Sequence, residues 1–283
     1  MGRLGGFLRL TRPVNCLMMG FAVIVGAALA IQDNTTFLWL DLLYGFVTGF
    51  MLTAASMSIN DYYDREIDAV NEPKRPIPAG AVKPREACVF ALCLTAIGLV
   101  AALLSGVNSL VLAIFAWAVF VAYTTVGKSS GLPGNFLVSV CVAIPFVYGS
   151  VVVASAVELN VTFFALLAFL SNTGREITKG IVDVKGDESR HVMTLAVRFG
   201  EKSAAVAAVV FYLLAVSLSL VPWYLGLVSL WFVPLVAVTD IGLVVSSFLL
   251  IHDHSRENAR RIKNAVLLWF IFALLAFVAG ATG

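Results

Sequence analysis

Two polar segments of this otherwise apolar chain carry oxygen-bearing side chains at helical spacing. In the first, Asn60, Asp64 and Asp68 are spaced i, i+4 and i+8, and Asp61 precedes Asp64 by three residues. We expect the helix of the preceding apolar run to extend through this segment, so that these side chains lie along one face. Carboxylates that close repel one another unless a cation sits between them. Hard oxygen ligands suit Mg²⁺, so the segment is a candidate Mg²⁺ site, although a solvated acidic helix end would have the same composition.

The second polar segment adds basic residues to the same pattern. Arg175, Lys179, Asp183 and Asp187 follow one another at four-residue intervals, so a helix would carry all four on one face. Two carboxylate stripes with cations beside them suit a phosphate group that is clamped through Mg²⁺. Two segments of such similar design favour a functional site over acidic surface decoration.

The rest of the chain is apolar enough to lie in a lipid bilayer. Of its 283 residues, 60% are hydrophobic and 13% are charged, against about 25% charged in a soluble domain. Since a span needs roughly 20 mostly apolar residues, the apolar runs predict nine transmembrane helices. These lie at roughly 14–31, 37–58, 87–104, 107–124, 134–153, 161–174, 203–221, 227–250 and 265–281. The sixth is short, and we expect its helix to continue into the segment that begins at Arg175.

The positive charges are distributed with a strong bias. All 19 Lys and Arg residues fall on one side when nine helices are counted, and the four loops on the other side carry none. Membrane loops enriched in Lys and Arg are cytoplasmic. We therefore expect a multi-pass cell-membrane protein with a cytoplasmic N-terminus, cytoplasmic acidic segments and an external C-terminus. The net charge of +2 gives no reason to expect a nucleic-acid partner, and no feature implies a protein partner.

The positions of the two acidic segments predict the domain organisation. They follow the second and sixth predicted helices, in the long polar loops 59–86 and 175–202. This placement predicts one all-α domain over residues 1–283, with about nine helices around a central cavity and cytoplasmic cap loops after helices 2 and 6. It also indicates a weak internal repeat, roughly 14–124 and 134–250, followed by a final helix at 265–281.

The two acidic segments resemble the aspartate-rich motifs of the UbiA superfamily of intramembrane prenyltransferases. The first motif reads NDxxDxxxD at 60–68, and the second reads DxxxD at 183–187. Further similarities to that family are found in order along the chain. They are RPxN at 12–15, KRPIPAG at 74–80, and the pair Tyr123 and Lys128. The resemblance covers nearly the whole chain and includes the count of nine helices.

The resemblance implies a Mg²⁺-dependent transfer of a prenyl group from its diphosphate to a lipophilic acceptor, within the membrane. The implied metal ligands are Asn60, Asp61, Asp64, Asp68, Asp183 and Asp187. The implied partners of the diphosphate or the acceptor are Asn15, Asn60, Arg65, Lys74, Arg75, Lys128, Arg175 and Lys179. The catalytic set is Asp64, Asp68, Asp183, Asp187 and Tyr123. The ring of Tyr123 could stabilise an allylic carbocation through its π face.

The second motif also resembles one branch of the family. The string GREIxKxxxDxxGD at 174–187, followed by TLA at 194–196 and FG at 199–200, is similar to the archaeal lipid-forming branch. That branch attaches a geranylgeranyl group to geranylgeranylglyceryl phosphate. Gly180 departs from the acidic residue that the branch often has there. Lys185, Arg190 or Arg198 could bind the acceptor phosphate, or could simply anchor the loop on the cytoplasmic side. An aromatic quinone precursor is the alternative acceptor.

Two other classes of protein compete with an enzyme. A membrane transporter is compatible with nine helices and a weak repeat, but a transporter places ionisable residues near the bilayer midplane. Here the predicted spans are almost bare, and Asp240 is the nearest exception. A non-catalytic scaffold could use the charged loops for docking, but it leaves the two matched acidic segments unexplained.

Overall fold

The computed structural model describes residues 2–31, 39–125, 127, 130–189 and 192–282, and the long elements in these ranges are α-helices. Eight helical stretches within them are long and apolar enough to cross a membrane. They are Arg3–Ala30, Trp39–Tyr63, Pro84–Leu104, Val107–Thr125, Leu132–Ala154, Glu201–Tyr224, Phe232–His252 and Arg256–Ala281. The prediction of an all-α polytopic membrane protein is confirmed.

The sixth predicted span lies in a helix that is not one of those eight. This helix, α8 (Leu159–Ser189), has 31 residues, and only its first part is apolar. Its buried polar residues begin at Ser171 and continue through Asn172 and Thr173. The expectation that the short sixth span continues as a helix into the charged segment is confirmed. The count of nine spans stays a prediction.

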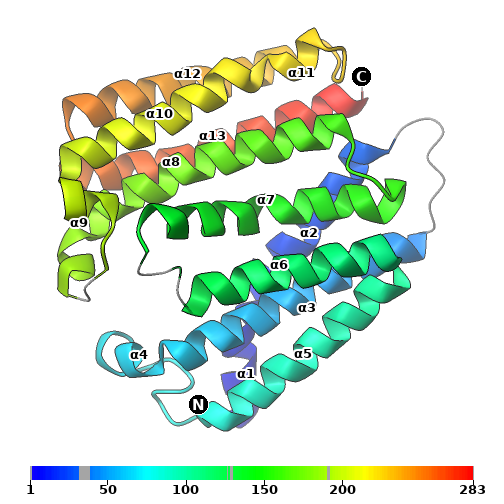
Figure 1. Ribbon diagram of the computed structural model, residues 1–283, viewed down its shortest axis with the longest axis vertical. Helices are drawn as coiled ribbons and strands as arrows, with labels where there is room; N and C mark the ends of the chain where they lie inside the picture. Colours follow the sequence, from blue (N-terminus) through cyan, green and yellow to red (C-terminus); the bar gives the residue numbers. More distant parts are fainter. Residues whose placement is uncertain (1, 32–38, 126, 128–129, 190–191, 283) are drawn as a thin grey trace. The chain divides into compact units, whose positions relative to one another are not determined.

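The helices form two compact units, which are described separately. Unit 1 comprises residues 1–125 and 145–157. Its helices are α1 (Arg3–Thr11), α2 (Pro13–Ala30), α3 (Trp39–Tyr63), α4 (Arg65–Asn71), α5 (Pro84–Leu104), α6 (Val107–Thr125) and the second part of α7 (Leu132–Ala154). Helix α3 packs against α2, α5 and α6, so it is the central helix of this unit (Figure 1).

Two glycines let α2 and the second part of α7 pack backbone against backbone. A Cβ on Gly26 would overlap the carbonyl oxygen of Phe146, and a Cβ on Gly149 would overlap the carbonyl oxygen of Val23. Small residues at such crossings allow the close helix packing that stabilises membrane bundles. Helix α7 contains Pro145, where the chain passes from unit 2 to unit 1.

Unit 2 comprises residues 126–144 and 158–283. Its helices are the first part of α7, α8, α9 (Leu195–Phe199), α10 (Glu201–Ser219), α11 (Val221–Tyr224), α12 (Phe232–His252) and α13 (Arg256–Thr282). Helices α8, α10, α12 and α13 contact one another in a closed ring, which makes a four-helix bundle (Figure 1). Its core includes Ile177, Tyr212, Leu243 and Val266, all buried.

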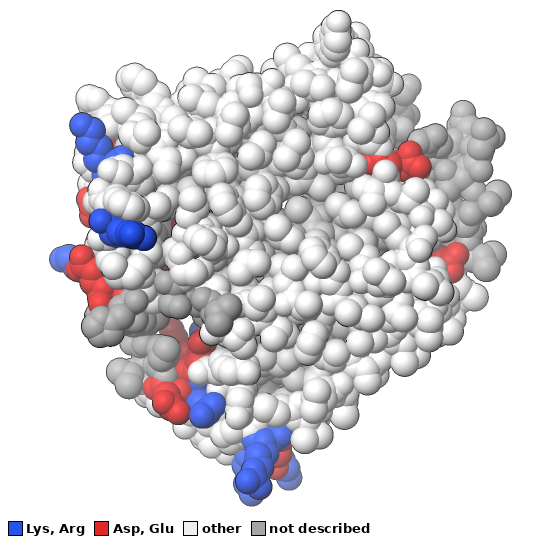
Figure 2. All heavy atoms as spheres, in the orientation of Figure 1, with Lys and Arg blue, Asp and Glu red and all other residues white. Residues whose placement is uncertain are grey.

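The charged side chains gather at the helix ends of each unit. In unit 1 the described Lys and Arg residues precede α2 or lie between the end of α3 and the start of α5. In unit 2 they lie on the second half of α8 and near the starts of α10 and α13. In the view of Figure 2, the helix flanks show mostly uncharged atoms. The internal repeat, the central cavity, the cap loops and the side of the membrane that the charges face stay predictions.

Candidate active site: two acidic motifs

The first acidic motif, residues 60–68, lies in unit 1 where α3 ends. Helix α3 ends at Tyr63 and α4 begins at Arg65, so the prediction of one uninterrupted helix through Asp68 is wrong at Asp64. The physical reason is local, because Asp64 has φ −81° and ψ −3°, a conformation typical of turns. The amide nitrogens of Asp64 and Asp68 still bond to the carbonyl oxygens four residues earlier, over 2.9 and 2.8 Å. The i, i+4 spacing of the acids therefore survives the break.

Asn60 and Asp64 are joined by their side chains. Asn60 Nδ2 donates a hydrogen bond of 2.9 Å to Asp64 Oδ2, and both residues are half-buried. This bond holds the amide of Asn60 beside the carboxylate of Asp64. Amide and carboxylate oxygens are ligands that Mg²⁺ takes in proteins. The structure thus places two of the predicted metal ligands together.

The other two acids of the first motif form a buried ion network. Asp61 lies 2.7 Å from a guanidinium nitrogen of Arg12 and 3.5 Å from one of Arg75, and Asp68 lies 2.6 Å from the same nitrogen of Arg75. The side chains of Asp61 and Asp68 are 4% and 8% exposed. Burial lowers the pKa of Arg75, but the bond to Asp68 and the charges of both acids outweigh it and raise the pKa overall. Arg75 therefore stays charged at any working pH.

Local packing fixes the backbone on which these arginines lie. Arg12 is the left-handed residue between α1 and α2, with φ 49°. The loop that carries Arg75 is held by buried Ile77 and Val82, which pack with Leu10 of α1 and Ala87 of α5. The sequence identified Arg12 only as part of a motif. Its bond to Asp61 joins residues 49 positions apart, so no local spacing could have indicated it.

The remaining predicted phosphate partners in unit 1 differ in their surroundings. Arg65 donates a hydrogen bond of 2.9 Å to the carbonyl oxygen of Tyr62. Its guanidinium carbon also lies 4.7 Å from the centre of the Tyr62 ring. Lys74 and Asn15 are exposed. Tyr123 is half-buried near the end of α6. The structure joins Asn60 to Asp64, and it joins Asp61 and Asp68 through Arg75. Within the described part of the chain, Lys74 and Asn15 make no hydrogen bond or ion pair with these residues.

The second acidic motif lies in unit 2, on α8. The helix continues to Ser189, so Arg175, Lys179, Asp183 and Asp187 lie on one face, as predicted. Asp183 and Asp187 are half-buried. Within the described part of the chain, Asp183 has no hydrogen bond or ion pair. Its carboxylate is therefore available to a ligand without breaking an internal contact.

A glutamate that the sequence did not single out connects the two cations of this face. Glu176 Oε1 lies 3.0 Å from Arg175 Nη1, and its Oε2 lies 3.3 Å from Lys179 Nζ. The carboxylate is 10% exposed. Among the described residues, the buried Nε of Arg175 has no hydrogen-bond partner. The i, i+3 spacing of Glu176 and Lys179 could have indicated this group from the sequence.

Close packing against α10 sets the position of α8. A Cβ on Gly174 would lie 2.7 and 2.8 Å from ring carbons of Tyr212 and 3.0 Å from the carbonyl oxygen of Ala208. One turn later, the hydroxyls of Thr178 and Tyr212 are 3.0 Å apart and fully buried. Because Gly174 and Thr178 lie on either side of Arg175 in the chain, this packing fixes the part of α8 that carries Arg175.

The start of α13 is tied to α8 beside Asp183. Arg256 Nε donates a hydrogen bond of 2.9 Å to the carbonyl oxygen of Val182. The two residues are 74 positions apart, so the sequence could not pair them. Lys185 and Arg198 are exposed. Lys128 and Arg190, which were also predicted to bind phosphate, lie outside the described residues.

In the described part of the chain, no three His, Cys, Asp or Glu side chains converge as a metal-binding cluster. The half-buried acid Asp240 has a partner in the neighbouring helix, because the hydroxyl of Ser219 of α10 donates a hydrogen bond of 2.7 Å to its carboxylate. This bond is of the kind that holds membrane helices together.

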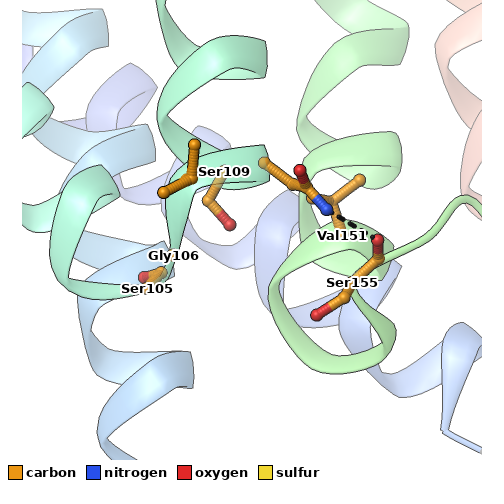
Figure 3. A pocket seen from close by; sticks show the side chains of 7 residues that line it. Ser105, Gly106, Ser109, Val151 and Ser155 are labelled. Atoms are coloured by element: carbon orange, nitrogen blue, oxygen red, sulfur yellow. Dashed lines mark hydrogen bonds between the residues drawn. The ribbon is translucent and has the colours of Figure 1, made fainter.

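A small polar pocket in unit 1 lies at the other end of α5 from the first motif. It has a volume of about 140 Å³ and is lined by Ser105, Gly106, Val107, Asn108, Ser109, Val151 and Ser155. Figure 3 shows its walls, with the 3.1 Å bond from Asn108 to the carbonyl oxygen of Ser155. None of these side chains is an acid or a base, so the pocket offers no acid–base or metal chemistry.

Comparisons with known proteins agree with the motifs. The model of the UbiA prenyltransferase family matches residues 19–275. The digeranylgeranylglyceryl phosphate synthase of Archaeoglobus fulgidus is 37% identical over 276 residues, which cover 96% of this chain and 94% of that protein. A solved structure concerned with digeranylgeranylglyceryl phosphate synthase in membranes has 30% identity and a TM-score of 0.88, covering 99% of both chains.

A more distant solved structure has the same fold. It is a UbiA homolog from Archaeoglobus fulgidus bound to GPP and Mg²⁺, with a TM-score of 0.70 and 17% identity, covering 96% of this chain and 99% of that one. The family match spans more than the segment between the two acidic motifs and includes both of them. The motifs, the eight apolar helical stretches and the extent of these matches lead to one conclusion. The chain belongs to the UbiA prenyltransferase family.

Proposed function

We propose that this membrane prenyltransferase transfers a geranylgeranyl group from its diphosphate to geranylgeranylglyceryl phosphate, in archaeal ether-lipid synthesis, and releases pyrophosphate. The observation that carries the proposal is the pair of acidic motifs, each accompanied by arginines. The relative that is 37% identical bears the name of the enzyme for this reaction. The second motif is similar to the same branch of the family, which supports the choice of acceptor.

The oxygen donors fit Mg²⁺ better than a transition metal. They are one amide and several carboxylates, whereas zinc sites draw on Cys and His. Fewer than three acids converge within the described part of the chain. This suits an ion that takes one or two protein carboxylates and completes its shell with water and substrate phosphates. Asn60, Asp64, Asp68, Asp183 and Asp187 are the proposed ligands, and the bound ion would stabilise charge on the diphosphate oxygens.

The basic residues would bind the rest of the diphosphate charge. Arg175 and Lys179 already lie on the helix face that carries Asp183. The Nε of Arg175 has no hydrogen-bond partner among the described residues, so it could donate a hydrogen bond to a phosphate oxygen. When the allylic C–O bond breaks, its electron pair leaves with the pyrophosphate. Preorganised cations at that place lower the barrier, because they do not have to reorient as the charge develops.

The carbon skeleton of the substrate needs an apolar and dry environment. The face of Tyr123 is our candidate to stabilise the allylic cation. The hydroxyl oxygen of the acceptor then forms the new C–O bond, and its proton passes to the pyrophosphate that the reaction releases. Excluding water from the site protects the cation from hydrolysis. The apolar helices supply the surroundings for both prenyl tails.

We also propose the orientation in the membrane. The N-terminus and both acidic motifs face the cytoplasm and the C-terminus lies outside, because the Lys and Arg residues gather with those motifs. Water-soluble diphosphate head groups would then reach the motifs from the cytoplasm, while the tails remain in lipid. Labelling single cysteines placed in the 222–226 loop with a membrane-impermeant reagent tests this orientation.

Pyrophosphate release tests the enzymatic proposal. Purified protein is given Mg²⁺ and geranylgeranyl diphosphate. Three reactions are compared: one with geranylgeranylglyceryl phosphate, one with an aromatic quinone precursor, and one without an acceptor. We expect release only with the glyceryl phosphate. Release with the aromatic acceptor alone would favour the quinone branch. No release with either acceptor, together with uptake of a labelled solute by proteoliposomes, would favour a transporter.

A further inference from the structure

The buried ion network of the first motif is electrically complete without a ligand. Asp61 and Asp68 contribute two negative charges, and Arg12 and Arg75 contribute two positive charges. All three distances that define the network lie within unit 1. A divalent cation without diphosphate would find Asp68 already neutralised by Arg75. The positive charge of the Arg75 guanidinium would repel this cation.

The two acids are held differently. Asp61 contacts both arginines, at 2.7 Å for Arg12 and 3.5 Å for Arg75. Asp68 contacts Arg75 alone among the described residues, at 2.6 Å. If Arg75 turns away, Asp61 keeps Arg12 as its partner and Asp68 loses its counter-ion. Asp68 is therefore the acid that a metal can take, and Asp61 is the acid that stays paired.

The surroundings of Arg75 allow its side chain to turn while its backbone stays fixed. The backbone amide of Arg75 bonds to the carbonyl oxygen of Glu72 over 2.9 Å, and its own carbonyl accepts from Ala79 over 2.9 Å. Buried Ile77 and Val82 anchor the same loop. The Arg75 side chain is 31% exposed, so the guanidinium has an open side toward which it can move.

We propose that Arg75 is an exchangeable counter-ion, which neutralises Asp68 until a metal–diphosphate complex binds, and then releases Asp68 to the metal and takes the diphosphate. Asp61, paired with Arg12, is in this account a positioning residue and not a metal ligand. The inference deepens the proposed function and rests on it. Its consequence is that metal and diphosphate bind together, each raising the affinity for the other by the same factor.

Metal binding without turnover tests the exchange. Mn²⁺ stands in for Mg²⁺, and its binding to the purified protein is followed by electron paramagnetic resonance, with and without inorganic pyrophosphate. In the wild type we expect weak Mn²⁺ binding that pyrophosphate strengthens by about tenfold or more. In Arg75→Gln, Mn²⁺ alone binds about tenfold more tightly, and pyrophosphate adds less, because the competing cation is gone.

Four further variants separate exchange at Arg75 from other effects. Arg75→Lys keeps the charge and should restore weak binding of Mn²⁺ alone. Arg85→Gln removes an exposed charge from the start of α5, in the same unit, and should leave Mn²⁺ affinity close to that of the wild type. Asp68→Asn should weaken Mn²⁺ binding with pyrophosphate by more than tenfold, whereas Asp61→Asn should keep it within about threefold.

The possible outcomes are distinguishable. Equal Mn²⁺ affinity in the wild type and Arg75→Gln overturns the proposal, as does an equal gain in Arg75→Gln and Arg85→Gln, which would reflect long-range charge only. A loss in Asp61→Asn as large as that in Asp68→Asn makes Asp61 a ligand and overturns its positioning role. If the Mn²⁺ results hold but no acceptor yields pyrophosphate, the proposed function fails and the exchange at Arg75 stands.

Discussion

Replacing Gly174 by alanine should move α8 and disable the second motif. The added Cβ would lie 2.7 Å from a ring carbon of Tyr212, whereas carbon atoms pack best at about 3.5–4.0 Å. The helices must therefore separate by about 1 Å. Tyr212 cannot turn aside, because it is fully buried and its hydroxyl is bonded to Thr178.

The expected change in stability is the sum of three terms. Overpacking costs about 1–3 kcal/mol, and losing the bond between Thr178 and Tyr212 costs about 0.5–1.5 kcal/mol. Alanine returns up to about 1 kcal/mol of helix propensity. The net loss is about 0.5–4.5 kcal/mol, which at about 2–4 °C per kcal/mol corresponds to a fall in Tm of about 1–18 °C. A displacement of about 1 Å at Arg175 should also lower kcat/KM by about 100-fold.

Thermal unfolding in detergent and steady-state pyrophosphate release measure the two effects. Gly186→Ala, on the same helix, is the matched control for stability. A Cβ added at Gly186 would meet no other atom within 4 Å. It should keep the wild-type Tm or raise it slightly. An unchanged Tm and an unchanged kcat/KM in Gly174→Ala would refute the reasoning, since they would mean that α8 and α10 are not packed this closely.

Three further predictions concern the motifs themselves. Asp64→Asn and Asp183→Asn should each lower kcat by more than about 100-fold, and Asp183→Asn should keep the wild-type Tm. Wild-type rates in both variants would contradict the two-motif site. EDTA should stop turnover and excess Mg²⁺ should restore it, whereas activity after complete chelation would exclude the metal clamp. Arg256→Ala should speed amide hydrogen exchange around Val182 and cost about 1 kcal/mol; exchange rates equal to the wild type would show that this hydrogen bond does not hold α8.

Local patterns predicted the helices well, because hydrophobic length and spacing determine them. The second motif shows this best, since its charged residues repeat every four positions and α8 does continue to Ser189. The break in the first motif was not predicted. A turn at Asp64 keeps the same i, i+4 backbone bonds that a helix would have, so residue spacing alone cannot distinguish the two.

The contacts of Arg12 and Arg256 depend on tertiary structure, so the sequence could not predict them. Arg12 bonds to Asp61 across 49 positions, and Arg256 bonds to Val182 across 74. Such contacts follow from how α1, α3, α8 and α13 pack, and no spacing rule encodes them. Glu176 is the exception, because its position relative to Lys179 is a local signal that spacing could have revealed.

The most direct test of the account is mass spectrometry of the product formed from geranylgeranyl diphosphate. The purified protein is incubated with Mg²⁺ and with geranylgeranylglyceryl phosphate beside an aromatic quinone precursor, and the lipids are extracted. We predict digeranylgeranylglyceryl phosphate in an amount equal to the pyrophosphate released, and none from Asp64→Asn. A prenylated aromatic product, or no condensation product from a protein with the wild-type Tm, would contradict the account.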